Sequence, residues 1–362
     1  MRLIDESAIK NIAIGASFFG AGGGGNPYYG MLQAVAAVRQ YGPVKLLDVS
    51  EIDPAAWYSP VAGMGAPAVG LEKFARGDEY QRVFDAVAQY TGHHFAGTFP
   101  IEAGGGNSLV PLTLAATMNL PLVDADSMGR AFPELQMSTL ALAGVTTTPM
   151  AITDVQGNTS IINTVTGKWA ERLARAETVE MGGTATVSLY ACTGAQLRDH
   201  GVTGIVTACE LVGSRIRDAH RDPEAALTEI LDITHGYELF TGKIIDVERR
   251  TEKGFNVGEI KIDGYDDYEG HKLSVMIQNE NLIAIRDGQP ITMTPDLIEI
   301  LDAETLEPVT TEVIKYGKRV RVLGTPADAK WRTPAGIACV GPRYFHFDYD
   351  YVPLEQLIKE AK

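Results

Sequence analysis

The sequence has few cysteines and no long apolar runs. Its 362 residues include three cysteines, Cys192, Cys209 and Cys339, which lack the paired spacing of a structural zinc site. An odd number of scattered cysteines is typical of reduced thiols, and two acidic residues at positions 5 and 6 interrupt any secretory signal. No apolar run approaches the roughly 20 residues of a membrane span. We therefore expect a cytoplasmic protein.

Basic residues are also in short supply. There are 31 lysines and arginines against 46 aspartates and glutamates, which gives a formal net charge of -15. Such a surface repels phosphate backbones and anionic lipid, so nucleic acid and membranes are poor candidate partners. The 7 histidines show no metal-ligand spacing. We expect a small-molecule substrate and a homo-oligomer.

The chain is too long for one compact core, and its pattern changes near the middle. Strand and helix patterns alternate over residues 1–165, which predicts an α/β domain with a largely parallel sheet and flanking helices. Short β-rich segments dominate residues 166–362 and predict a smaller, mostly antiparallel C-terminal domain.

The tetrapeptide Gly-Gly-Gly-Asn occurs twice, at 23–26 and at 104–107. A helix pattern follows each copy, and Asn26 with Pro27 is a typical helix start. We expect both loops at the carboxyl edge of the sheet, where backbone N–H groups face a ligand crevice. The candidate substrate-binding residues are Gly23, Gly24, Gly25, Asn26, Gly105, Gly106 and Asn107.

The first glycine run also fits a dinucleotide-binding fingerprint. Gly20, Gly22 and Gly25 have the GxGxxG spacing, and Asp48 follows at the distance of a ribose-binding acid. A glycine-dense run matches many templates, and no clear strand precedes it. An NAD- or nucleotide-binding oxidoreductase is therefore an alternative that depends on a strand before Gly20.

A second polar set follows the second glycine loop. Asp124 and Asp126 leave a buried strand two residues apart, where paired carboxylates can hold a metal or share a proton. Glu102, Arg130 and Glu134 add to the set. The alternative is structural: Asp126 caps a turn and Asp124 is a solvated strand end.

Three stretches carry a family resemblance. Residues 20–26, 102–108 and 124–134 resemble the S-methyl-thiohydantoin desulfurase family, and Trp-Arg-Thr-Pro-Ala-Gly at 331–336 and Gly-Pro-Arg at 341–343 extend the similarity over almost the whole chain. The resemblance implies an enzyme that replaces a sulfur substituent on a five-membered cyclic ureide by hydrolysis.

In that reaction Asp124 or Asp126 would activate the water, directly or through a divalent metal bound by the two acids. Glycine-loop N–H groups and Asn107 would hold the ring, and Glu134 is a further substrate-binding candidate. Glu102 is a further catalytic candidate, as is Arg130. Arg130 would pair with a substrate carboxylate or orient Asp126.

Two further functions stay open beside the oxidoreductase: a hydantoin-type ring-opening hydrolase and a non-catalytic ureide-binding protein. Release of thiol separates desulfurisation from ring opening, and any turnover separates both from a binding protein. Cys192 lies among small residues and is interpreted as a core residue, not as a nucleophile.

Overall fold

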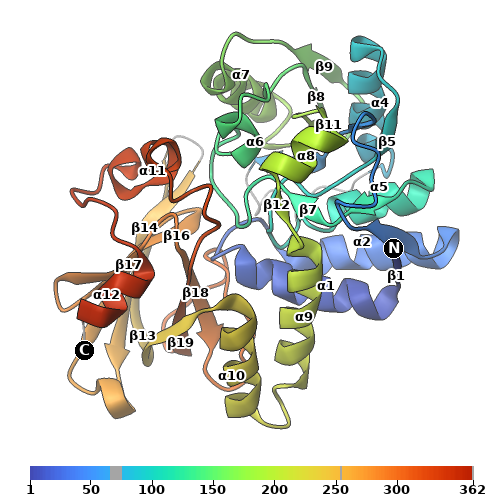
Figure 1. The fold of residues 1–362 in the computed structure, drawn as a ribbon. Coiled ribbons are helices and arrows are strands. Elements are labelled where there is room, and N and C mark those ends of the chain that lie inside the picture. Colours follow the sequence, from blue (N-terminus) through green and yellow to red (C-terminus); the bar gives the residue numbers. More distant parts are fainter. Residues whose placement is uncertain (66–75, 253–254, 361–362) are drawn as a thin grey trace.

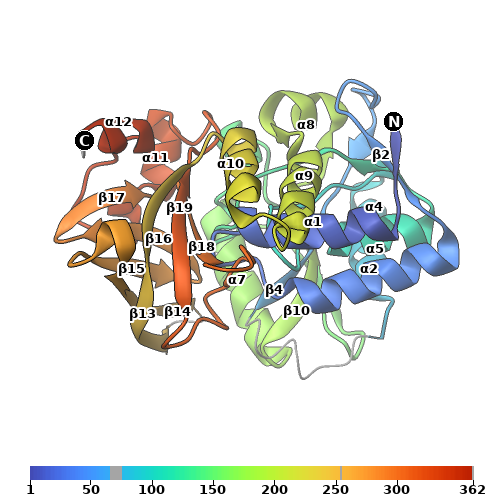
Figure 2. The same cartoon turned by 90° about the horizontal axis from the view of Figure 1, so that it is seen from below.

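The computed structural model describes residues 1–65, 76–252 and 255–360, which form two lobes (Figure 1). One lobe holds the N-terminal helices and several small sheets, and the other holds one large sheet (Figure 2). The mixed α/β organisation in two parts agrees with the sequence prediction. Among the described residues, no helix combines the length and the apolar character needed to cross a bilayer.

Two helices flank the first glycine run. α1 (Glu6–Phe19) begins after Asp5, whose carboxylate accepts a hydrogen bond from a first-turn N–H. α2 (Pro27–Tyr41) begins after Asn26, whose side chain does the same, as the Asn-Pro pair predicts. Three of the glycines between the helices have positive φ, so neither helix can continue through the run.

The small sheets of the N-terminal lobe are mostly antiparallel. Among the described strands, only the pairs β2–β6 and β3–β5 are parallel. The predicted largely parallel sheet is therefore wrong. The strands are two to five residues long, and β10 to β12 return from later in the chain to pair antiparallel with earlier strands, so no βαβ series forms. The strands are β1 (Arg2–Ile4), β2 (Val44–Leu47), β3 (Trp57–Tyr58), β4 (Val61–Gly65), β5 (Phe95–Gly97), β6 (Leu122–Val123), β7 (Ala125–Asp126), β8 (Met150–Thr153), β9 (Thr159–Ile162), β10 (Thr184–Ser188), β11 (Cys192–Thr193) and β12 (Val202–Thr203).

Residues 167–234 pack with the N-terminal lobe in space. α9 (Ile205–Asp218) lies so close to α1 that a Cβ on Gly15 or Gly213 would come within 1.8 Å of a backbone oxygen of the opposite helix. The large sheet begins only after these helices, and the division of domains at residue 165 stays a prediction. The other helices of this lobe are α4 (Glu79–Thr91), α5 (Val110–Met118), α6 (Thr139–Leu142), α7 (Gly167–Glu180), α8 (Gly194–His200) and α10 (Pro223–Thr234).

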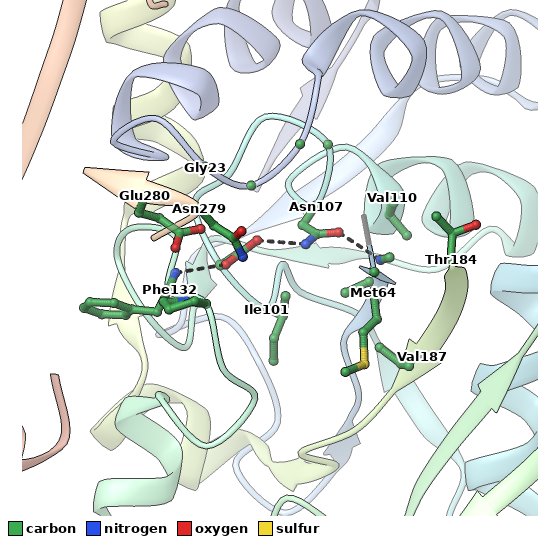
Figure 3. Close-up of a pocket in the computed structure, with 18 of the residues that line it drawn as sticks. Gly23, Met64, Ile101, Asn107, Val110, Phe132, Thr184, Val187, Asn279 and Glu280 are labelled. Carbon is green, nitrogen blue, oxygen red and sulfur yellow. Dashed lines mark hydrogen bonds between the residues drawn. The ribbon is translucent and has the colours of Figure 1, made fainter. Parts of the chain in front are cut away.

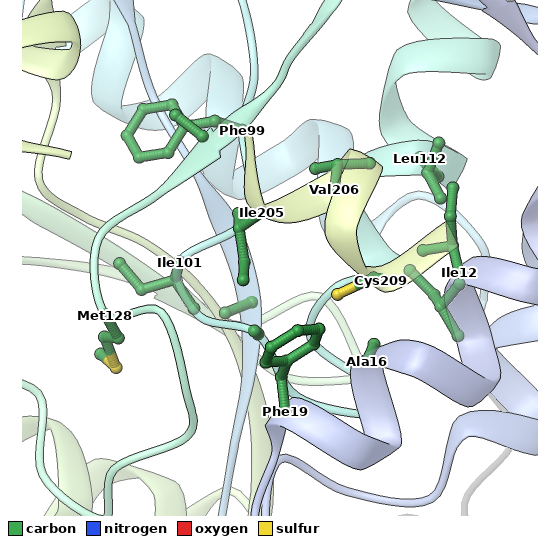
Figure 4. Packing of buried hydrophobic residues seen from close by; sticks show 14 of the residues in the cluster. Ile12, Ala16, Phe19, Phe99, Ile101, Leu112, Met128, Ile205, Val206 and Cys209 are labelled. Atoms are coloured by element: carbon green, nitrogen blue, oxygen red, sulfur yellow. The ribbon is translucent and has the colours of Figure 1, made fainter. Parts of the chain in front are cut away.

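One apolar core connects α1 and α9 to the loops that form the site. Figure 4 shows its buried side chains, among them Ile12, Ala16, Phe19, Phe99, Ile101, Leu112, Met128, Ile205, Val206 and Cys209. Ile101 and Met128 also line the cavity described below. The wall of that cavity is therefore anchored in the core.

The C-terminal lobe is a seven-stranded antiparallel sheet in the order β17-β16-β15-β14-β13-β19-β18. This confirms the predicted β-rich C-terminal part. Helices α11 (Pro334–Val340) and α12 (Leu354–Glu360) follow the sheet. The strands are β13 (Tyr237–Glu252), β14 (Phe255–Gly264), β15 (Lys272–Gln278), β16 (Glu280–Arg286), β17 (Gln289–Met293), β18 (Leu297–Asp302) and β19 (Arg319–Thr325).

Candidate active site

The two Gly-Gly-Gly-Asn loops pack directly against each other. Gly106 N–H donates to Gly24 O at 2.7 Å, and Asn107 N–H approaches the same oxygen at 3.4 Å. A Cβ on Gly24 would lie 2.2 Å from the Cα of Gly104, so only glycine permits this approach. The loops converge as the sequence predicts, but they do so through mutual backbone contact, not through neighbouring strands of a parallel sheet.

A cavity of about 680 Å³ opens beside these loops, between the two lobes (Figure 3). The N-terminal lobe contributes both glycine loops, β4, β10 and the segment 128–135. The C-terminal lobe contributes residues of β13 and β14 and the turns that precede β16 and β19. These two turns are held on the first glycine run, because Asn281 N–H donates to Ala21 O at 2.8 Å and Thr311 N–H donates to Gly22 O at 2.9 Å.

Glu102 is a buried carboxyl on the wall of this cavity. It accepts hydrogen bonds from Asn107 Nδ2 at 2.8 Å and from Phe132 N–H at 3.4 Å. Asn107 Oδ1 in turn accepts from Gly63 N–H at 2.8 Å, which fixes the orientation of the amide (Figure 3). Burial raises the pKa of Glu102 to about 7, against the hydrogen bonds from Asn107 and Phe132, which lower it. Both protonation states are therefore populated near neutral pH.

Glu280 is a second buried carboxyl on the cavity, and the sequence analysis missed it. It is the first residue of β16, and its carboxyl group lies over Gly23 (Figure 3). Burial and then the charge of Glu102 raise its pKa well above the ordinary value. The sequence held one signal: the polar run Asn279-Glu280-Asn281 interrupts two apolar strand patterns.

Arg130 does not contact Asp126, nor does it line the cavity among the described residues. Its fully buried guanidinium donates to the carbonyl oxygens of Ala131, Pro295, Asp296 and Asn281. These bonds join the two lobes and use most of the N–H donors of the guanidinium, so few donors remain for a substrate carboxylate. The predicted pairing of Arg130 with Asp126 is therefore not found.

Asp124 and Asp126 are buried and do not line the cavity among the described residues. Asp124 accepts from Val206 N–H at 2.9 Å and Thr207 N–H at 3.1 Å, and also from the Thr207 hydroxyl, so it caps the start of α9. Asp126 Oδ1 accepts from the N–H groups of Met128 and Gly129 at 3.0 and 2.7 Å. The two acids thus do not join the glycine loops, and the predicted single pocket for all four features is not formed.

The other predicted site residues lie in two kinds of place. Gly23, Gly24, Gly25, Asn26, Gly106, Asn107 and Glu134 line the cavity. Gly105 instead packs against the backbone of the first loop, since a Cβ there would lie 2.3 Å from Gly25 O. Asn26 uses its side chain as a helix cap, and Glu134 accepts from the Tyr344 hydroxyl at 2.8 Å.

The structural context of a dinucleotide site is absent from the described N-terminal residues. Helix α1, not a strand, precedes the first glycine run. Asp48 accepts from the backbone and hydroxyl of Ser50 in a surface turn and does not line the cavity among the described residues. The fingerprint is therefore a coincidence of glycine spacing.

The geometry defines a two-lobe α/β protein with two buried carboxyls facing one interlobe cavity. The chain belongs to the S-Me-THD-like family: the model of the family's N-terminal domain matches residues 7–164, and that of its C-terminal domain matches residues 165–354. This confirms the resemblance found in the motifs.

One solved structure supports the fold. A crystal structure of a protein from Chromobacterium violaceum, determined as a structural genomics target, is 22% identical with a TM-score of 0.81. The alignment covers 98% of this chain and 100% of that chain, so the whole two-lobe architecture is shared. No curated protein matches the chain significantly.

Proposed function

We propose that this protein is an enzyme that replaces a sulfur substituent on a five-membered cyclic ureide with oxygen, using water. The family name points to an S-methyl-thiohydantoin as the substrate class. The observation that carries the proposal is Glu102, a cavity carboxyl whose pKa burial raises to about 7. A carboxylate with that pKa can accept a proton from water and return it at the same pH.

The reaction needs one base and one oriented electrophile. Water attacks the ring carbon that bears sulfur while Glu102 accepts the water proton. The tetrahedral adduct then collapses, the carbon–sulfur bond breaks, and Glu102 returns a proton to the departing sulfur. A thiol and the oxygenated ring leave, so Glu102 ends in its starting state.

Asn107 and the glycine loops form the proposed binding site for the flat substrate ring. Asn107 Nδ2 donates to Glu102 at 2.8 Å, so the amide holds the base in position. A Cβ on Gly25 would meet no atom closer than 3.9 Å, which shows that the space above this glycine is open. We expect the ring to lie against Gly25 and Gly106, where no side chain prevents close contact with the backbone.

The donor set at Asp124 and Asp126 does not fit the divalent metal expected from the sequence. Asp124 Oδ1 and Asp126 Oδ1 already accept backbone N–H groups, and Asp124 Oδ2 accepts the Thr207 hydroxyl, so only Asp126 Oδ2 has no partner among the described residues. The part of the chain that the structure describes also holds no group of three His, Cys, Asp or Glu side chains suited to a metal ion. We therefore assign water activation to Glu102 alone.

Thiol release tests the proposal. The purified full chain is incubated with S-methyl-thiohydantoins that differ at the ring substituent, and thiol is measured with a chromogenic disulfide while mass spectrometry follows the ring. The expected result is stoichiometric thiol and an intact ring with oxygen in place of sulfur. Ring opening without thiol would replace the proposal with a hydantoin-type hydrolase, and tight binding without turnover would replace it with a binding protein.

A further inference from the structure

Gly23 is a glycine because of Glu280, not because of its backbone conformation. Its φ is not among the positive values found at its neighbours Gly22, Gly24 and Gly25. A Cβ on Gly23 would lie 2.1 Å from Glu280 Oε1 and 2.6 Å from both Cδ and Cγ. Any other residue here would displace the carboxyl group. The first glycine loop thus leaves the space at Gly23 that the Glu280 side chain occupies.

The turn that carries Glu280 is held from both sides by main-chain hydrogen bonds. Asn279 adopts a left-handed conformation with φ 58°, and its N–H donates to Asn256 O at 2.8 Å. Asn281 N–H donates to Ala21 O at 2.8 Å on the glycine run. The residues on either side of Glu280 are therefore fixed, one within the C-terminal lobe and one against the N-terminal lobe.

The Glu280 carboxyl is buried, with 3% of the residue exposed, yet it belongs to the lining of the cavity. Oε2 has no hydrogen-bond partner among the described residues. The ionisable groups that act on it are Glu102, Arg130 and Glu312. Burial and Glu102 raise the pKa of Glu280 more than Arg130 lowers it, so the environment favours the protonated form of this carboxyl, which is a hydrogen-bond donor.

We propose that Glu280 is a second catalytic residue, a general acid that protonates the ring nitrogen next to the carbon that water attacks. This inference rests on the proposed function of the cavity. Because the charge of Glu102 disfavours ionisation of Glu280, one carboxyl can be ionised while the other keeps its proton, and such a pair is suited to base and acid roles. Glu102 serves as the base, and Glu280 serves as the acid.

The proton transfers balance over one turnover. In the addition step the water oxygen bonds to carbon, Glu102 accepts a water proton, and Glu280 donates its proton to the ring nitrogen. In the elimination step the carbon–sulfur bond breaks, the new hydroxyl returns its proton to Glu280, and Glu102 protonates the departing sulfur. The products are a thiol and a ring with a carbonyl and an N–H, and both carboxyls return to their starting states.

The test compares E280Q with E299Q, measuring thiol release against pH. Glutamine at 280 keeps the shape of the protonated acid but cannot transfer a proton, so we expect kcat to fall about 100- to 10,000-fold. The wild-type rate should decline at alkaline pH as Glu280 ionises, and that decline should disappear in E280Q. Glu299 is equally buried beside Arg130 but does not line the cavity among the described residues, so E299Q should keep both the rate and the decline.

A second variant tests the contact between Gly23 and the Glu280 carboxyl, and it covers the case in which E280Q does not fold. G23A keeps the carboxyl but displaces it, so kcat should fall in the wild-type background and change little in E280A, where no carboxyl is left to displace. Equal losses in both backgrounds, or full activity in E280Q, would overturn the role of Glu280 and leave the proposed function standing. A wild-type protein that releases no thiol would overturn both.

Discussion

The molecule contains two sets of buried carboxyls that differ in what they face. Asp124 and Asp126 use their oxygens to bind backbone N–H groups of the N-terminal lobe. Glu102 and Glu280 face the interlobe cavity, which Asp124 and Asp126 do not line among the described residues. One oxygen of Glu280 and one of Asp126 have no partner among these residues, so an unpartnered oxygen does not separate the two sets. Burial alone does not separate these sets, because all four side chains are less than a tenth exposed.

The difference lies in whether the carboxyl group faces the cavity. A carboxylate whose oxygens accept several backbone N–H bonds stabilises a local conformation, and removing it leaves those donors unpaired. A carboxyl that faces a cavity can exchange protons with a ligand. The Glu102–Glu280 set is thus suited to chemistry and the Asp124–Asp126 set to structure, and the predictions below test that contrast.

The largest expected effect is on turnover in E102Q. Glutamine keeps the size of the side chain and its contact with Asn107 but cannot accept the water proton, so kcat for thiol release should fall about 100- to 10,000-fold. The circular dichroism spectrum and the melting temperature at neutral pH should show a folded protein. A folded E102Q that turns over within about threefold of wild type would remove Glu102 from the mechanism.

The next effect is on the pH dependence of stability. The pKa of Glu102 is about 7 in the folded chain against 4.5 in the unfolded reference, so the folded state favours the protonated form. Wild-type stability should therefore fall as pH rises from 4.5 to 7, by at most about 3 kcal/mol for this one group.

E102Q should lack that decline and be more stable than wild type above pH 7 but not below pH 4.5. Urea unfolding at pH 4.5, 6 and 8 gives the comparison. Glu304→Gln removes an equal charge from an exposed position and serves as the control. Parallel stability curves for wild type and E102Q would contradict the assigned burial of the Glu102 charge.

A smaller effect is expected for Asp124→Ala. This change removes the cap of α9, and the free energy of unfolding should fall by about 2 kcal/mol, the upper end for a helix cap. Asp222→Ala removes the exposed cap of α10 and should cost less. Thiol release per folded molecule should stay near wild type. Loss of turnover in folded protein would return Asp124 to the catalytic role that the sequence suggested.

Local signals in the sequence were sufficient for much of the fold. Asn26 and Pro27 begin a helix because the cap and the fixed φ of proline act within a single turn. The parallel sheet was predicted wrongly, because the partners of β4 and β3 lie more than a hundred residues later in β10 and β11. The residue pattern within a short stretch of sequence does not show which distant strand a given strand pairs with.

The candidate site was predictable to the extent that its residues lie close in sequence. Both glycine loops and Glu102 stood out because repeated glycines beside a carboxylate are unusual. Glu280 comes from the other lobe, and its link to Gly23 exists only after the lobes dock. The sequence spacing of Asp124 and Asp126 does not show that Oδ1 of each accepts backbone N–H groups, or that neither acid lines the cavity among the described residues.

The smallest expected effect is that of Cys192→Ala. Cys192 has no exposed surface, packs in the apolar core of the N-terminal lobe and does not line the cavity among the described residues. Burial raises the pKa of its thiol to about 12, so it is not a thiolate at neutral pH and is a poor nucleophile. Removing the sulfur should leave a small cavity and cost about 1 kcal/mol, measured by urea unfolding, while kcat stays near wild type. Cys339→Ala, at a half-buried position, is the matched control and should cost less. A loss of turnover by about three orders of magnitude in folded Cys192→Ala would instead indicate covalent catalysis by the thiol, and Glu102 would then have to act on that thiol and not on water.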